Sequence, residues 1–289
     1  MAWVNAVIQG ILLGGLYALF ATGLSLVFGV MRLVNLAHGD LSILAAFLLV
    51  AIVDSIGLDP WLGLVLVVPA MFVIGYLLQY GLLNITLSSG VLAPLLVTFG
   101  LAIILQNVLL EVFSADSRGL DAGTIETKSI HLSDELSIGW FPLITFLVSV
   151  VLLGALQLML SRTRLGRVLR ATADDQGAAQ LMGIDHRRVY ALAMGIALGT
   201  VALAGVFLGM RTTFAPGIGP ARLIFAFEAV IIGGLGSLWG TLVGGVVLGV
   251  AQTVGAQISP GWGVLTGHLV FLAILATRPT GLFARQAPT

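Results

Sequence analysis

The first residues that could do chemistry lie in the stretch VNLAHGDLS, residues 34 to 42. Its polar side chains interrupt two apolar segments, and they are Asn35, His38, Asp40 and Ser42. Ionisable groups at membrane depth are costly and usually line a cavity or a transport pathway. The stretch therefore predicts either a broken helix beside a pathway or a plain loop at the membrane surface.

A second candidate is Glu228, the only acid between Arg222 and the C-terminus. At 1.5 Å per residue it lies roughly 9 Å beyond Arg222 along a helix. Glu228 is therefore a pathway residue, an ion partner of Arg222 or Arg211, or an acid near the membrane interface. We expect His268, in the last apolar segment, to be a satisfied histidine of the bundle rather than a ligand.

A third candidate is the charged segment GRVLRATADDQGAAQLMGID, residues 166 to 185. One helical face carries Leu165, Val168 and Leu169 and, after a gap, Leu181 and Met182, while charged residues cover the remainder. The pattern predicts a short amphipathic helix that ends at Gly183. Such a helix either docks on a partner or belongs to a basic cytoplasmic loop that only fixes the topology.

Several catalytic patterns are missing from the sequence. It has no G-x-x-x-x-G-K-[ST] loop, no H-E-x-x-H and no cysteine, and its one lysine, Lys128, lacks the glycine of a phosphate loop. Asp40 and Asp54 are too far apart in sequence to suggest a peptidase dyad. The chain is therefore not a phosphate-loop ATPase, and an intramembrane hydrolase is the least favoured class.

The composition indicates which elements position these residues. Hydrophobic residues make up 58% of the chain and charged residues 9%, and the mean hydropathy is +1.10. Residues 1–31, 60–110 and 229–277 contain no Asp, Glu, Lys or Arg. About 20 apolar residues span a bilayer, so the chain is a multi-span membrane protein. Its formal net charge of zero gives no sign of a nucleic-acid partner.

We expect an all-α polytopic bundle of about 8 to 10 transmembrane helices, including broken or short spans. The apolar segments lie near residues 5–29, 41–56, 61–83, 91–113, 141–161, 189–210, 223–256 and 263–277. Segment 223–256 is too long for one helix, and GGLGS at 233–237 predicts a break that lets it cross twice. Glycines four residues apart predict close helix packing, as in Gly10 with Gly14 and Gly245 with Gly249.

The connections predict the orientation of a single domain over residues 1–289. Residues 114–140 hold five acids and two bases, whereas residues 162–188 hold six of the thirteen Lys and Arg. By the positive-inside rule, the first connection is extracytoplasmic and the second, together with Arg278 and Arg285, is cytoplasmic. No Lys or Arg precedes Arg32, so we expect the first apolar segment to remain as a span. The side of the N-terminus stays open.

Four ordered segments carry a resemblance over essentially the whole length. They are GLYALFATGLSLVFGVMRLVNLAHGDLSILAAF (15–47), the segment 166–185, VIIGGLGSLWGTLVGGVVLG (230–249) and RPTGLF (278–283). The chain resembles the branched-chain amino acid type of ABC importer permease. The resemblance implies a transport subunit, not an enzyme, in the bacterial inner membrane. It also implies separate ATPase subunits that hold the ATP, a sister permease that usually makes a heterodimer, a periplasmic solute-binding protein, surrounding membrane lipid, no nucleic acid and no cofactor in this chain.

The resemblance also assigns roles to residues. It places a coupling helix within residues 166–185, with ATPase-coupling residues Arg167, Arg170, Ala178, Leu181, Gly183 and Ile184. Candidates for the translocation path are Asn35, His38, Asp40, Ser42, Glu228, Gly233, Gly234 and Gly236. The acid after His38 and Gly39 is Asp40, where relatives often have glutamate, and no fixed acid of the family corresponds to Glu228.

Two alternatives remain open at this level. Relatives with nearly the same motifs carry urea or short-chain amides, so the solute is not fixed by the resemblance. A stand-alone secondary transporter could instead use His38, Asp40 and Glu228 as a proton or ion relay.

Overall fold

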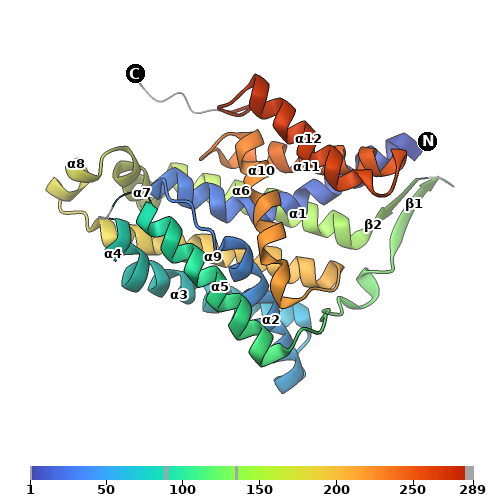
Figure 1. Cartoon of the computed structure of the whole chain (residues 1–289), viewed down its shortest axis with the longest axis horizontal. Helices are drawn as coiled ribbons and strands as arrows, with labels where there is room; N and C mark the ends of the chain where they lie inside the picture. The colour runs from blue at the N-terminus through green and yellow to red at the C-terminus, as the bar shows by residue number, and fades with distance from the viewer. Residues whose placement is uncertain (1, 88–89, 91, 134–135, 284–289) are drawn as a thin grey trace.

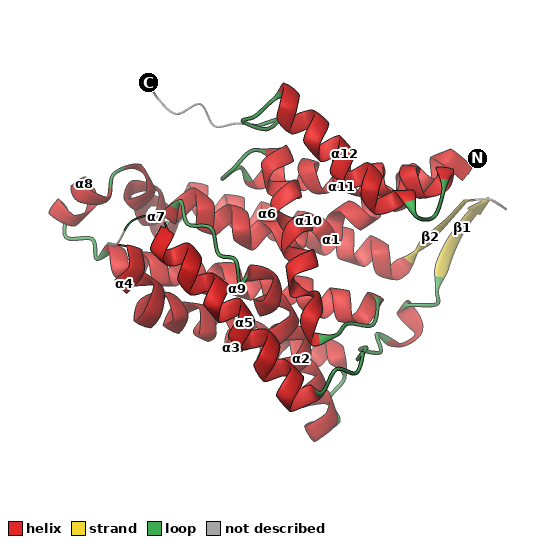
Figure 2. Cartoon of the chain, in the orientation of Figure 1, coloured by secondary structure: helices red, strands yellow, loops and turns green. Residues whose placement is uncertain are grey.

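The computed structural model describes residues 2–87, 90, 92–133 and 136–283. Within these residues, eight helices are long and apolar enough to cross a membrane, and α12 (Trp262–Thr277) is a shorter apolar helix. Figure 2 shows that helices make up nearly the whole molecule, with one small hairpin of strands. The expected all-α polytopic bundle is confirmed, while Arg285 lies outside the described residues.

The helix bounds agree with the expected segments to within a few residues. The other helices are α1 (Ala2–Met31), α2 (His38–Ile56), α3 (Pro60–Leu78), α4 (Asn84–Leu87), α5 (Leu92–Phe113), α6 (Trp140–Arg162), α7 (Arg164–Asp174), α8 (Gln176–Leu181), α9 (His186–Arg211), α10 (Gly219–Gly233) and α11 (Leu238–Ile258). A π-helical stretch (Gln79–Leu83) joins α3 to α4, and β1 (Ser129–Ser133) pairs antiparallel with β2 (Leu136–Gly139).

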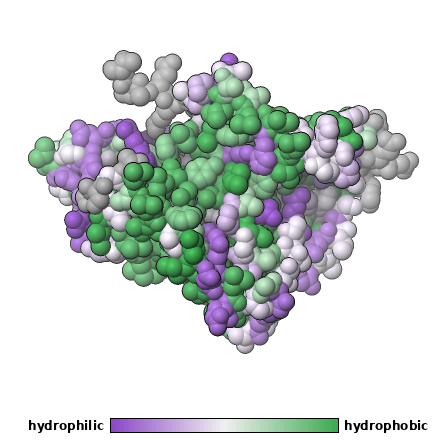
Figure 3. All heavy atoms as spheres, in the orientation of Figure 1, coloured by the Kyte–Doolittle hydropathy of each residue, from purple (hydrophilic) through white to green (hydrophobic). Residues whose placement is uncertain are grey.

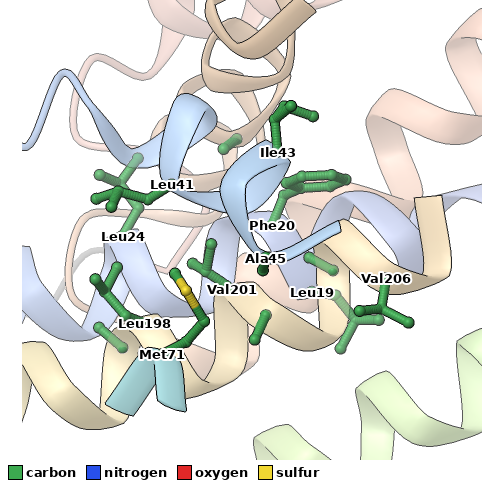
Figure 4. Packing of buried hydrophobic residues seen from close by; sticks show 14 of the residues in the cluster. Leu19, Phe20, Leu24, Leu41, Ile43, Ala45, Met71, Leu198, Val201 and Val206 are labelled. Atoms are coloured by element: carbon green, nitrogen blue, oxygen red, sulfur yellow. The ribbon is translucent and has the colours of Figure 1, made fainter. Parts of the chain in front are cut away.

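Helices α1 and α9 form the centre of the bundle. The most apolar part of each is 83% buried, compared with 17% for α5 and 22% for α6. Figure 4 shows side chains from α1, α2, α3 and α9 packed together, including Phe20, Leu41, Met71 and Val201. The outer helices instead expose large apolar side chains, such as Val151 at 69%, as lipid-facing helices do.

Glycines bring α1 and α11 into backbone contact. A Cβ added to Gly14 would lie 2.8 Å from the carbonyl oxygen of Gly245, and one added to Gly10 would lie 2.9 Å from that of Gly249. These distances leave no room for a side chain on either helix. The predicted role of the spaced glycines in close packing is confirmed for this pair of helices.

The molecule has two distinct ends along α1. The β1–β2 hairpin and the N-terminus lie at one end, and α7 and α8 lie at the other (Figure 1). A hydrogen bond of 2.8 Å from Gln9 Nε2 to the Ser137 carbonyl oxygen fixes the start of α1 beside the hairpin. We refer to these as the hairpin end and the α7–α8 end.

Two helices begin in the middle of the molecule rather than at an end. The first residue of α2, His38, contacts the carbonyl oxygen of Phe20 through Nε2 at 2.9 Å. Phe20 lies about 16 Å from the end of α1 at 1.5 Å per residue, so residues 32–37 run back into the bundle. The start of α10 at Gly219 packs against Gly39 and Asp40 of α2. The broken-helix prediction for residues 34–42 is therefore confirmed, and the surface-loop alternative is wrong.

The predicted break at GGLGS is also confirmed. Helix α10 ends at Gly233 and α11 begins at Leu238. Gly234 and Gly236 adopt φ values of 100° and 80°, which residues with a Cβ rarely adopt. Segment 223–256 therefore forms two helices, as its length required.

Candidate functional site

Four polar residues in the break between α1 and α2 and in the first turns of α2, which we call the polar turn, are almost completely buried. They are Asn35, His38, Asp40 and Ser42, and none is more than 1% exposed. Asn35 Oδ1 accepts a hydrogen bond of 3.0 Å from the Ala37 amide, and Ser42 Oγ donates one of 2.6 Å to the Gly39 carbonyl. Side chains thus satisfy backbone groups that the helix break leaves open, as non-helical backbone at membrane depth requires.

Helix α5 holds the polar turn from the other side. Gln106 Nε2 donates to Asp40 Oδ1 at 2.9 Å, and Thr98 Oγ1 accepts from the Leu36 amide at 3.1 Å. The second carboxylate oxygen, Asp40 Oδ2, is buried without a hydrogen-bond partner in the described part of the chain. An open acceptor therefore lies beside the start of α10, where two discontinuous helices meet, as in many transport sites.

Glu228 has a partner that the sequence did not predict. Its Oε1 is paired with Nδ1 of His268 on α12, and the Glu228 residue is only 3% exposed. Among the described residues it forms no ion pair with Arg222 or Arg211, so the alternative of an arginine partner is wrong. The reason is that α12 packs against α10 and presents His268 at this depth. His268 is a satisfied bundle histidine, as expected.

The structure separates the predicted path residues into two places. Gly233, Gly234 and Gly236 form the turn between α10 and α11, at the α7–α8 end, where a Cβ on Gly29 would lie 3.2 Å from Gly236 Cα. The amides of Leu282 and Phe283 bond to the carbonyl oxygens of Ile232 and Gly233, at 2.8 and 3.1 Å. This glycine turn is therefore not part of the polar turn, because the length of α10 lies between them.

The predicted amphipathic helix is two helices rather than one. Asp175 is extended, with φ −148°, and its Oδ1 caps α8 by accepting from the Ala178 amide at 2.9 Å. Leu169 of α7 is fully buried in the bundle core, whereas Leu181 and Met182 of α8 are 91% and 83% exposed. The single apolar stripe is therefore wrong, because the cap at Asp175 turns α8 away from the face that α7 buries.

The tip of α8 is a defined surface rather than a loose loop. Gly183 closes the helix with φ 81°, its amide bonds to the Gln180 carbonyl at 2.9 Å, and the Ile184 amide bonds to the Ala179 carbonyl at 3.1 Å. Of the predicted coupling residues, Arg167, Ala178, Leu181 and Gly183 are exposed, and Arg170 and Ile184 are half-buried. Two large apolar side chains, Leu181 and Met182, are therefore exposed at an otherwise polar end.

A cavity of about 700 Å³ lies behind this surface. Its walls come from the end of α1, from α6 and α7, and from the start of α11, and include Ser25, Arg32, Leu169, Arg170, Gly236 and Trp239. Helix α7 and the glycine turn therefore face each other across open space.

Sequence reasoning missed Gln106, Tyr17 and Gln252, and also the partner of His268. Gln106 binds Asp40, Tyr17 donates to Gln252, and His268 pairs with Glu228. The available signal was that each is a polar residue inside an apolar span. That signal shows that a partner is needed but not which helix provides it.

A family model described as "Branched-chain amino acid transport system / permease component" matches residues 6–275. The chain is similar to the high-affinity branched-chain amino acid transport system permease protein BraD of Pseudomonas aeruginosa, with 30% identity over 98% of this chain and 96% of the relative. It is similar to the corresponding LivH protein of Escherichia coli, with 29% identity and the same coverage. No solved structure gives a significant match.

Proposed function

The chain belongs to the family of branched-chain amino acid transport system permease components, and from this premise we propose that it imports branched-chain amino acids as the membrane subunit of an ATP-driven transporter. The observation that carries the proposal is the match of nearly the whole chain to relatives named for this transport. The protein is a multi-pass membrane protein and a transport component rather than an enzyme. Its membrane is the bacterial inner membrane.

Separate ATPase subunits drive the transport. They dock on the α8 tip, where Leu181 and Met182 enter an apolar groove and Ala178, Gly183 and Ile184 set the shape of the contact. Arg167 and Arg170 face acidic ATPase side chains or lipid headgroups. The exposure of Leu181 supports this assignment, since a 91% exposed leucine on a capped helix gains from burial against a partner.

The α7–α8 end is cytoplasmic and the hairpin end is extracytoplasmic. Residues 162–188 carry six of the thirteen Lys and Arg, which supports the cytoplasmic side. The bond between Gln9 and Ser137 then puts the N-terminus outside, on the side where a periplasmic solute-binding protein delivers the solute. Residues 1–289 work as one permease domain.

A sister permease covers the face that carries α5, α10 and α12. Figure 3 shows hydrophilic patches within the hydrophobic surface of this face. Asn107 and Arg211 are exposed, and the His268 side chain is 36% exposed. Exposing polar side chains of membrane-spanning helices to lipid is unfavourable. These side chains are more stable facing a second permease, with a polar path between the two proteins.

Transport follows from a tilt of α10. ATP binding moves the docked α8 and with it α7, and the motion reaches the glycine turn through α1, which packs against α7, α10 and α11. Since α10 joins this turn to the polar turn, the displacement changes the opening beside Asp40. The path candidates in the polar turn then line the passage, and the glycine turn acts as its hinge.

A deletion and rescue experiment tests the proposal in cells. Removing the gene of this chain should abolish high-affinity leucine uptake, and a plasmid copy should restore it. The uptake should persist when a protonophore collapses the proton gradient while ATP is maintained. Uptake that disappears with the proton gradient would instead support a secondary transporter.

A further inference from the structure

Helix α10 carries a polar stripe that faces three other helices. Arg222, Phe225 and Glu228 follow one another at intervals of three residues, so they share one face of the helix. Phe225 lies between two rings, with centroids 5.3 Å from Tyr17 of α1 and 6.0 Å from His268 of α12. We call these three α10 residues the α10 stripe.

Three hydrogen-bonding atoms on or beside the α10 stripe have no partner. They are Arg222 Nε, Gln252 Nε2 and Glu228 Oε2, each buried and unbonded within the described residues. Gln252 and Glu228 are only 7% and 3% exposed. Arg222 Nε and Gln252 Nε2 are hydrogen-bond donors, and Glu228 Oε2 is an acceptor. An unmade bond at this depth is unfavourable, so the arrangement points to a ligand that supplies the missing partners.

Tyr17 of α1 contacts both helices that carry these groups, α10 through Phe225 and α11 through Gln252. Its hydroxyl donates a hydrogen bond to Gln252 Oε1. The same hydroxyl lies within electrostatic range of Arg222, Arg211 and Glu228. Tyr17 is at the midpoint of α1, close to the level of Phe20 and the polar turn. The open atoms therefore belong to residues of α10 and α11 on either side of a contact with the middle of α1.

We propose that this cluster transiently binds the zwitterionic headgroup of the transported α-amino acid. The carboxylate accepts hydrogen bonds from Arg222 and Gln252, and the ammonium group donates to Glu228. Phe225 and Tyr17 offer apolar surface to the solute side chain. This assignment rests on the proposed transport function and adds to it the residues that recognise the charged part of the solute.

The chemistry of the cluster discriminates between the solutes that the family resemblance left open. Urea and short-chain amides carry no formal charge and cannot satisfy a guanidinium donor and a carboxylate acceptor together as an ion pair. A zwitterion presents both charges a few ångströms apart. The cluster is also reachable, because Arg222 is half-buried and His268 is 36% exposed on the face assigned to the sister permease.

Binding of leucine to the assembled transporter, without solute-binding protein, tests the proposal. The complex in lipid nanodiscs would receive radiolabelled leucine, with competition by leucine, 4-methylpentanoate, which lacks the ammonium group, and 3-methylbutylamine, which lacks the carboxylate. Wild type should prefer leucine to both analogues by roughly ten-fold or more, since each analogue forfeits a charged hydrogen bond. Glu228→Gln should abolish the preference over 4-methylpentanoate, and Arg222→Gln the preference over 3-methylbutylamine.

Two further variants separate recognition from structure. Glu111→Gln removes an exposed acid at the far end of α5 and should bind leucine as wild type does. The double variant Glu228→His with His268→Glu keeps the pair between α10 and α12 but moves the carboxylate acceptor to α12. Its leucine binding should therefore be as weak as that of Glu228→Gln. Recovery of binding in the exchanged protein would show that the pair is only a structural tether and would overturn the proposal.

Other outcomes are equally decisive. Unchanged leucine binding in Glu228→Gln and Arg222→Gln, equal losses for all three compounds, or no binding by wild type at millimolar leucine would each overturn the site. ATP-dependent uptake by the wild-type complex, measured in parallel, identifies what has failed. If wild type takes up leucine normally and the variants bind leucine as wild type does, only the proposed binding site is wrong. If wild type takes up no leucine, or takes up urea instead, the proposed function is wrong and so is the site.

Discussion

Within the described residues, Asp40 is held in the bundle by one side-chain hydrogen bond, which Gln106 on α5 donates. His38, two residues earlier, is fully buried and contacts the backbone of α1, so this acid and this base have different partners. Glu228 on α10 is bonded in the same incomplete way as Asp40. One of its oxygens pairs with His268, and the other has no hydrogen-bond partner among the described residues. At the scale of residues, Asp40 and Glu228 are therefore buried carboxylates with one oxygen bonded and the other open among the described residues.

Removing the partner of Asp40 should destabilise the protein. Gln106→Leu leaves the Asp40 carboxylate without its donor, which costs about 1–3 kcal/mol for a buried polar group. We expect a lower unfolding temperature in detergent and reduced uptake. Asn107→Leu, the exposed neighbour on the same helix, is the matched control and should leave the unfolding temperature unchanged.

Gly183 tests the α8 tip directly. Its φ of 81° strains any residue with a Cβ, although a Cβ there would meet nothing within 4 Å. Gly183→Val should therefore leave the bundle folded but shift Leu181, so that ATP hydrolysis continues while uptake falls by roughly ten-fold or more. Gly177→Ala on the same helix should keep both activities. Normal uptake in Gly183→Val would remove the α8 tip from the coupling path.

At the scale of elements, the sequence predicted where helices lie better than how they meet. Apolar length and GGLGS correctly gave the spans and the break between α10 and α11. The stripe in residues 165–182 misled, because a cap at Asp175 redirects the chain and periodicity contains no information about such a turn. The partners of Asp40 and Glu228 were also missed, because they come from α5 and α12. The pattern of apolar residues does not reveal which polar residues of distant spans meet.

The contact between α1 and α11 gives a prediction at this scale. Gly14→Ala pushes a methyl group into the backbone of α11, where Gly245 O is 2.8 Å away, and overpacking of this kind costs about 1–3 kcal/mol. Thermal unfolding in detergent should show a clear loss of stability. Gly154→Ala on α6 meets nothing within 4 Å and should be neutral or slightly stabilising. Equal behaviour of the two variants would contradict the packing described for α1.

At the scale of the whole molecule, polar groups are placed by depth and by face. The two ends hold the hairpin and the α7–α8 segment, and α1 and α9 form a nearly fully buried axis between them. Outer helices expose apolar side chains to lipid, while the face of α5, α10 and α12 also exposes polar ones. This arrangement fits a permease that is one half of a pore and whose moving end is opposite the end that receives the solute.

The absence of cysteine from the sequence makes the orientation easy to test. Asn5→Cys, at the hairpin end, should react with a membrane-impermeant maleimide applied outside intact cells. Gln176→Cys, at the start of α8, should react only after the membrane is permeabilised. The opposite pattern would reverse the proposed sides and would place the α8 tip out of reach of a cytoplasmic ATPase.

The most direct measurement is uptake of radiolabelled leucine into proteoliposomes that hold this chain with its sister permease and ATPase subunits, with solute-binding protein and ATP supplied. Each component is then omitted in turn. The account predicts that leucine accumulates only when this chain, the ATPases, the binding protein and hydrolysable ATP are all present. Accumulation by this chain alone, driven by an ion gradient, would contradict it.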